Sequence, residues 1–206
     1  MTDSFALFGE SRRPWLDADE LKSKFLHFSS SLHPDRFHNT PAEEKEKAGQ
    51  SYSDLNTAYN TLREPKDRLL HLIELEQGKA PSDIQRIPPG TMDLFVEVGQ
   101  MCRDADGFLK EKPTEVSPML KLKVMQESME WTEKLSDLQT KIHALRQSLE
   151  KELSLMNAVW EFAPPPGSPE RLGKLPMERL EQIYRTFSYV SRWTEQIQER
   201  TVQLAF

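Results

Sequence analysis

Three consecutive residues, His33-Pro34-Asp35, combine side chains that could do chemistry. An imidazole and a carboxylate can move protons, ligate a metal or accept hydrogen bonds, and the proline between them fixes a backbone torsion angle. With average residue usage, such a tripeptide arises by accident in about one chain in a hundred of this length. Its meaning therefore depends on the elements that hold it.

A metal site is one alternative, because His33, Asp35 and the nearby His38 are all possible ligands. Their spacing fits no two-histidine helical motif, and the other histidines have no companion carboxylate pattern. No glycine-rich turn between a strand and a helix offers a phosphate site, and no Ser-His-Asp or Cys-His arrangement stands out. We expect no catalytic residue, no metal and no cofactor.

Composition indicates an all-α protein. Only eight of the 206 residues are glycine, and leucine, glutamate, lysine, glutamine and methionine are abundant. The net charge of −6 and the lack of a basic stripe argue against a nucleic-acid partner. Cys102 is the single cysteine, which excludes an internal disulfide. We find no leader-like N-terminus and no long apolar run, so we expect a cytoplasmic protein without membrane contact.

Two predicted helices flank the tripeptide. The first spans residues 17–32 and carries one apolar stripe, which consists of Leu21, Phe25, Phe28 and Leu32. Pro34 ends this helix, because proline disfavours the helical conformation in the residue before it. The second spans residues 40–62, and Thr40-Pro41 supplies an N-cap and a first-turn proline. A short connection makes such helices antiparallel, so the tripeptide lies at the turn of a hairpin, and a short helix over 66–76 follows.

Proline-rich breaks at residues 76–90 and 163–176 divide the remaining sequence. Helices are predicted over 91–110, 118–162 and 177–204, and their apolar periodicity predicts an antiparallel three-helix bundle. On the first of these helices we expect four apolar residues to face inward, namely Met92, Phe95, Val96 and Met101. The expected domains are residues 1–76, a linker at 77–90, and the helical bundle at 91–206.

The position of the tripeptide favours binding, because exposed connections on rigid scaffolds are where binding residues concentrate. Lys22 and Lys24 precede it and Arg36 follows it. A simpler alternative is that Pro34 only stops a helix and Asp35 only caps a turn.

Residues 3–76 resemble a J domain, and specifically that of the HscB co-chaperone family of iron–sulfur cluster assembly. The resemblance rests on "FALFG" at the start, "HPDRF" in the loop, "LNTAYNTLREPKDRLLHLIEL" at the end, and a C-terminal helical domain in place of a glycine-rich or zinc-binding region. It implies a protein that is not an enzyme and that activates the ATPase of a DnaK/HscA-type chaperone.

The resemblance also implies a chaperone-binding surface. Its residues are His33, Pro34, Asp35, Arg36, Lys22 and Lys24. Asp35 would accept charge-assisted hydrogen bonds from an arginine of the chaperone, Pro34 would restrict how that carboxylate is presented, and His33 would brace the loop. The basic residues would steer an acidic partner surface.

A second implied surface binds an iron–sulfur scaffold protein of the IscU type. Its residues are Met92, Phe95, Val96, Glu97 and Tyr189. Apolar residues at helical spacing are more often core, and we expect these to be buried. Gly99, the sequence around Thr91, and a longer middle region over 111–176 depart from the family pattern. A J-domain protein for another client, or a helical interaction protein with an inert loop, remain alternatives.

Overall fold

The computed structural model describes residues 2–37, 40–81, 87–111 and 117–205, without the side chains of Pro34 and Asp35. Every regular element in these ranges is helical, as expected for an all-α protein. Contacts divide the chain into two compact units, residues 1–83 with 150–184 (unit 1) and residues 84–149 with 185–206 (unit 2). Among the described helices, none is long and apolar enough to cross a membrane.

Residues 150–184 group with the N-terminal residues in unit 1, so the compact units do not follow the predicted boundaries at 76 and 91. The long helices α6 (Pro118–Glu161) and α8 (Met177–Ala205) contribute residues to both units. The predicted J domain, linker and bundle are domains expected to fold independently, which the grouping of contacts into compact units does not test. That division stays a prediction.

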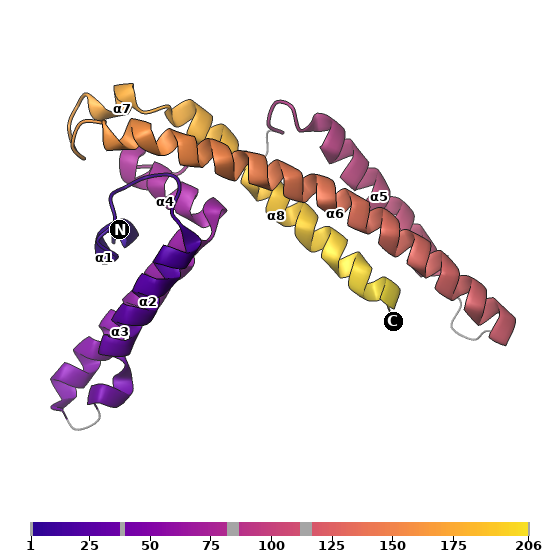
Figure 1. Ribbon diagram of the computed structural model, residues 1–206, viewed down its shortest axis with the longest axis horizontal. Coiled ribbons are helices and arrows are strands. Elements are labelled where there is room, and N and C mark those ends of the chain that lie inside the picture. The colour runs from indigo at the N-terminus through magenta and orange to yellow at the C-terminus, as the bar shows by residue number, and fades with distance from the viewer. Residues whose placement is uncertain (1, 38–39, 82–86, 112–116, 206) are drawn as a thin grey trace. The chain divides into compact units, whose positions relative to one another are not determined.

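The N-terminal part of unit 1 is a helical hairpin with short flanking helices (Figure 1). Its elements are α1 (Ser4–Leu7), α2 (Ala18–Leu32), the 3-10 helix η1 (Pro34–Phe37), α3 (Ala42–Arg63) and α4 (Pro65–Gln77). Asp17 caps α2, because its side chain accepts hydrogen bonds from the amides of Asp19 and Glu20. The predicted cap at Thr40 is wrong: Pro41 is the N-cap of α3, and the Thr40 hydroxyl donates instead to the carbonyl of Phe37 at 2.9 Å.

Aromatic side chains pack the hairpin together. The Phe8 ring meets the Phe28 ring edge to face at 6.0 Å, and the rings of Phe25 and Tyr59 stack at 4.2 Å. Such pairs add to the free energy gained by burying their area. The Phe25–Tyr59 stack joins α2 to α3, and so it helps to position the turn between them, whereas the Phe8–Phe28 pair joins the end of α1 to α2.

Unit 1 is completed by residues from the C-terminal half of the chain, including α7 (Arg171–Lys174). The side-chain amide of Asn157 on α6 exchanges two hydrogen bonds of 3.0 Å with the backbone N–H and C=O of Trp15. The segment between α1 and α2 is therefore fixed to α6.

Unit 2 is a three-helix bundle, as predicted, built from α5 (Met92–Glu111) and parts of α6 and α8. Its core is hydrophobic and consists of Val98, Cys102, Leu135, Leu138, Ile142, Tyr189, Val190, Trp193, Ile197 and Leu204. From α6, the fully buried positions begin at Leu135, whereas Leu120 in the first turn is 42% exposed. The first turns of α6 therefore contribute little to this core.

Candidate functional site

The His-Pro-Asp tripeptide lies at the turn of the hairpin, as its sequence position predicts (Figure 1). His33 ends α2 with backbone angles φ −59° and ψ 131°, which is the extended conformation that a following proline favours. Pro34 then begins the 3-10 helix, and the amide of Arg36 donates to the carbonyl of His33 at 3.0 Å. The tripeptide is therefore part of a hydrogen-bonded turn.

Side chains on both flanks tie this turn to the helices. The exposed His33 ring meets the Tyr52 ring of α3 edge to face at 5.7 Å. The guanidinium of Arg36 donates from Nη1 to the carbonyl of Ser30 at 3.1 Å, at the C-terminal end of α2 where carbonyls lack partners within the helix. The side chains of Pro34 and Asp35, and the whole of His38, lie outside the described residues, so neither the role of Asp35 nor the alternative metal site can be placed.

The three predicted basic residues differ in their surroundings. Lys22 and Arg36 are exposed. Lys24 instead forms an ion pair with Glu10, whose side chain is only 8% exposed and also accepts from Arg13 Nη2 at 2.7 Å. Lys24 thus helps to hold the segment before α2, a role that the sequence alone did not reveal.

The predicted scaffold-binding residues begin where α5 begins. Gly90, with φ at 79°, takes a left-handed conformation that suits glycine, and the buried Thr91 hydroxyl donates to the carbonyl of Pro88 at 2.8 Å. The turn leads into α5, whose buried face runs through Val98, Cys102 and Ala105.

The expectation that Met92, Phe95 and Val96 face inward is therefore wrong. They are 53%, 37% and 57% exposed, and none of them belongs to the unit 2 core. Met101, the fourth residue expected inward, is partly buried against the core. The three exposed side chains form an apolar surface at the start of α5, which we call the α5 apolar face.

Glu97 and Tyr189 border the α5 apolar face in different ways. The Glu97 carboxylate accepts from the ammonium of Lys141 at 2.5 Å, across to α6. Tyr189 is 7% exposed, and its ring supports the Phe95 ring edge to face at 6.0 Å. Sequence analysis missed Lys141, because a contact across 44 residues leaves no local signal. It also missed Arg192, whose guanidinium lies 5.6 Å from the centre of the Tyr189 ring.

Cys102 is a core residue of unit 2. It is 7% exposed and packs within the unit 2 core, and burial raises the pKa of its thiol. Within the described ranges, the histidine, cysteine, aspartate and glutamate side chains form no group of three that could hold a metal ion.

Comparison with known sequences finds similar proteins. No family model matches the chain. A protein of Mannheimia succiniciproducens, named co-chaperone protein HscB homolog, is 28% identical over 149 residues, which cover 62% of this chain and 84% of that protein.

Two solved structures share the fold. The crystal structure of the human co-chaperone protein HscB matches with a TM-score of 0.62 at 18% identity, covering 98% of this chain and 83% of that one. Chaperone HscB from Vibrio cholerae matches with a TM-score of 0.59 at 19% identity, covering 98% of this chain and 99% of that one. In sequence the chain is similar to a co-chaperone protein HscB homolog, and it shares its fold with two solved HscB structures.

Proposed function

We propose that this protein is a cytoplasmic co-chaperone of iron–sulfur cluster assembly. It stimulates the ATPase of a DnaK/HscA-type chaperone and delivers an IscU-type scaffold protein to it. The observation that carries this proposal is the His-Pro-Asp turn, held at the end of the helical hairpin, with the exposed Arg36 in the turn and the exposed Lys22 on α2. The similarity to a co-chaperone protein HscB homolog supports the same role.

The turn is suited to activating a partner by contact. The Arg36–Ser30 hydrogen bond and the His33–Tyr52 ring contact order the loop before binding, so less conformational entropy is lost when the partner docks. Asp35 then offers its carboxylate to an arginine of the chaperone. The hydrolysis itself belongs to the chaperone, and this chain supplies no catalytic residue.

The α5 apolar face is the scaffold-binding surface of this proposal. Exposed methionine and aromatic side chains make adaptable contacts and are frequent at the energetic centre of interfaces. Met92, Phe95 and Val96 provide this chemistry, and Glu97 adds an acidic group at the border.

Steady-state ATP hydrolysis by a DnaK/HscA-type chaperone tests the proposal. The full chain is expected to raise the rate, and to raise it further together with an IscU-type scaffold. Asp35→Asn should abolish the stimulation while helical circular dichroism stays unchanged. Glu199→Gln, the same carboxylate-to-amide change on the exposed side of α8, is the matched control and should stimulate fully.

Two outcomes would contradict parts of this proposal. Full stimulation by Asp35→Asn would mean that the loop is inert, so that the chain is a helical interaction protein. Stimulation of the chaperone without any binding of the scaffold in a titration would point to another client.

A further inference from the structure

Gly99 lies in the interior of α5, where glycine is an unfavourable residue for a helix. The position that it leaves without a side chain is covered by Arg103, because a Cβ added at Gly99 would lie 3.5 Å from Nη1 of Arg103. Side chains on a helix lean towards its N-terminus, so this guanidinium lies over the turn before its own backbone. The charge of Arg103 is therefore carried back towards the start of α5.

This arrangement brings the guanidinium close to the α5 apolar face. Phe95 and Val96 precede Gly99 by four and three residues, so they lie on the preceding turn of the same helix. The directions of Val96, Gln100 and Arg103 fall within about 60° of one another at 3.6 residues per turn. All three of these side chains are exposed. The exposed side of α5 thus changes from apolar to cationic within two turns.

Hydrogen bonds hold the guanidinium in place. Nη2 of Arg103 donates to Oε1 of Gln100 at 2.7 Å, and Nε2 of Gln100 donates to Oδ1 of Asp104 at 2.7 Å. The neighbouring carboxylate is therefore bonded by the amide and not by the guanidinium. Within the part of the chain that the structure describes, no carboxylate forms an ion pair with Arg103. Its charge is fixed in position, but this chain does not neutralise it there.

Such a guanidinium, at the edge of exposed apolar side chains, suits a carboxylate of a binding partner. Its planar fork can donate two parallel hydrogen bonds to one carboxylate, which gives direction as well as attraction. Because Gln100 already orders the side chain of Arg103, less entropy is lost when a partner binds. Arginine is also frequent among the residues that dominate the energy of an interface.

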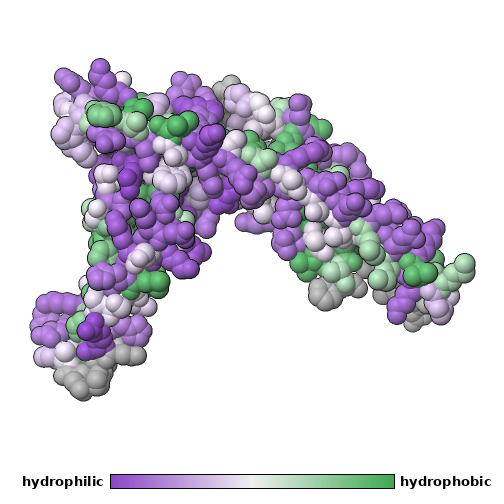
Figure 2. All heavy atoms as spheres, in the orientation of Figure 1, coloured by the Kyte–Doolittle hydropathy of each residue, from purple (hydrophilic) through white to green (hydrophobic). Residues whose placement is uncertain are grey.

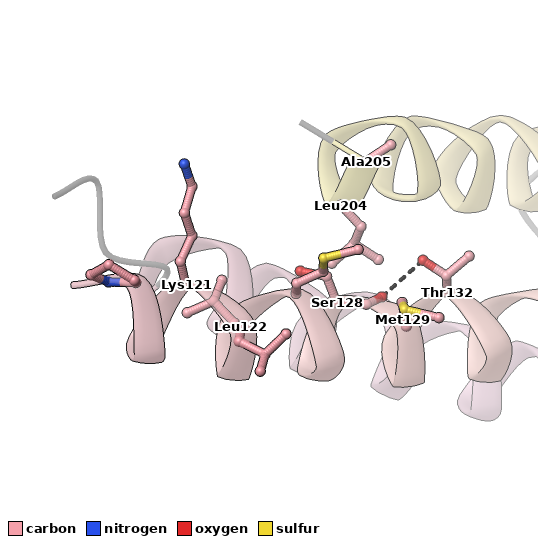
Figure 3. Close-up of a pocket in the computed structure, with 10 residues that line it drawn as sticks. Lys121, Leu122, Ser128, Met129, Thr132, Leu204 and Ala205 are labelled. Atoms are coloured by element: carbon pink, nitrogen blue, oxygen red, sulfur yellow. Dashed lines mark hydrogen bonds between the residues drawn. The ribbon is translucent and has the colours of Figure 1, made fainter. Parts of the chain in front are cut away.

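Another exposed apolar surface of unit 2, at the start of α6, differs in this respect. Leu122 and Met129 border a groove of about 590 Å³ there, together with Leu204 of α8 (Figure 3). Lys121 also borders this groove, and among the described residues its ammonium has no hydrogen-bond partner. Hydrophilic residues cover most of the face shown in Figure 2, so exposed apolar groups are exceptions on it. A lysine that nothing holds does not mark where a partner's charge lies, whereas the guanidinium of Arg103 does.

We propose that Arg103 extends the scaffold-binding surface beyond the α5 apolar face, and that the scaffold places an aspartate or glutamate carboxylate against its guanidinium. The apolar side chains contribute burial, and the charge pair selects scaffolds that carry a carboxylate at the matching position. Gly99 contributes because it adds no side chain that competes for the guanidinium. The inference rests on the proposed function, since it takes the α5 apolar face as the surface that the scaffold contacts.

Isothermal titration of the full chain with an IscU-type scaffold tests the charge pair, at about 50 mM and about 500 mM salt. Arg103→Glu should weaken binding at least about tenfold at low salt, because it brings like charges together, and less at high salt. Arg103→Lys should keep part of the affinity, since lysine keeps the charge but not the planar fork. Lys151→Glu makes a charge reversal of the same size at an exposed position in the unit 1 part of α6, and it should bind like the parent.

Variants of Gly99 separate scaffold binding from helix stability. Gly99→Glu gives Arg103 a carboxylate four residues away on the same helix, in the favourable order for such a pair. It should raise the free energy of unfolding and yet weaken scaffold binding at least about threefold, because the scaffold must then compete for the guanidinium. A purely structural role of Arg103 would not weaken binding in a more stable protein. Gly99→Ala adds no charge, its Cβ makes an ordinary contact with Arg103, and it should bind like the parent.

Scaffold variants identify the carboxylate. When the carboxylates of the scaffold are replaced by lysine one at a time, one such scaffold should bind Arg103→Glu more tightly than it binds the parent chain. Failure of every one of them to do so would overturn the inference. Full binding by Arg103→Glu, alongside weakened binding by Met92→Ala with Phe95→Ala, would overturn it and leave the proposed function standing. A parent chain that binds no IscU-type scaffold would overturn both.

Discussion

The guanidinium of Arg171 binds the carboxylate of Glu76 with two hydrogen bonds, from Nε to Oε2 at 2.7 Å and from Nη2 to Oε1 at 2.8 Å. Both side chains are nearly buried, at 6% and 2% exposed. Arg171 also donates to the carbonyl of Pro164 at 2.5 Å. The pair joins the end of α4 to α7, which are 95 residues apart, and this is one reason why residues 150–184 belong to unit 1.

Glu76→Gln should destabilise the protein strongly. The change leaves a buried guanidinium without its counter-charge, which costs about 3–5 kcal/mol. Urea unfolding followed by circular dichroism measures the loss. Glu152→Gln is the matched control, because Glu152 forms a bidentate pair with Arg179 whose side chains are 35% and 48% exposed. Such an exposed pair contributes at most about 1 kcal/mol. Equal losses for both variants would contradict the importance of burial.

Acid should weaken the attachment of α1 through His71. Its Nε2 accepts from the amide of Ser4 at 3.0 Å, which requires the neutral imidazole, and burial lowers the pKa of His71 below 6.5. The unfolded chain therefore binds the proton more readily than the folded one. The contribution to stability is complete above pH 6.5 and is lost as the pH falls through the folded-state pKa.

The measurement for His71 compares free energies of unfolding at about pH 7.5 and about pH 5.5. The parent should lose more stability on acidification than His71→Phe, which cannot titrate but still stacks beside Phe5, where the rings lie 5.9 Å apart. His143→Gln, at an exposed position on α6, should behave like the parent. Parallel pH profiles for the parent and His71→Phe would rule out this linkage.

Local signals made much of the fold predictable. Pro34 after the end of α2 is a short-range feature, and it acts where expected. Periodicity likewise predicted the helices of the bundle. It showed that Met92, Phe95 and Val96 lie near one another on α5, but it did not show which side of α5 faces the core. That depends on how α5 rotates against α6 and α8, through contacts such as the one between Glu97 and Lys141.

Polar pairs between residues far apart in the chain also could not be predicted from the sequence. Glu76 and Arg171 are each ordinary charged residues in their own surroundings, and only the folded chain removes both from water. The role of Lys24 was likewise hidden, because the sequence predicted it as part of a basic surface, whereas in the folded chain it pairs with Glu10. The His-Pro-Asp turn could be predicted, because its three residues are adjacent in the sequence. Its position at the end of a hairpin followed from the two predicted helices that flank it.

Met92→Ala combined with Phe95→Ala should weaken binding of an IscU-type scaffold at least about tenfold, the effect of removing central side chains of an interface. Because both side chains are exposed, the helical circular dichroism should not change. Isothermal titration with the scaffold measures the affinity. Val159→Ala, at another exposed apolar position, should bind like the parent. Unchanged affinity of the double variant would move the scaffold-binding surface away from α5.

Lys22 and Lys24 should affect different properties although they lie two residues apart. Lys22 is exposed, so Lys22→Glu should slow association with an acidic chaperone surface and leave the free energy of unfolding unchanged. Its effect should shrink as salt is raised, because ions screen exposed charges. Lys24→Met should instead lower stability, because it removes a partner from the nearly buried Glu10 carboxylate. Stopped-flow association rates and urea unfolding separate the two effects. A stability loss for Lys22→Glu, or none for Lys24→Met, would show that the ion pair with Glu10 does not hold the segment before α2.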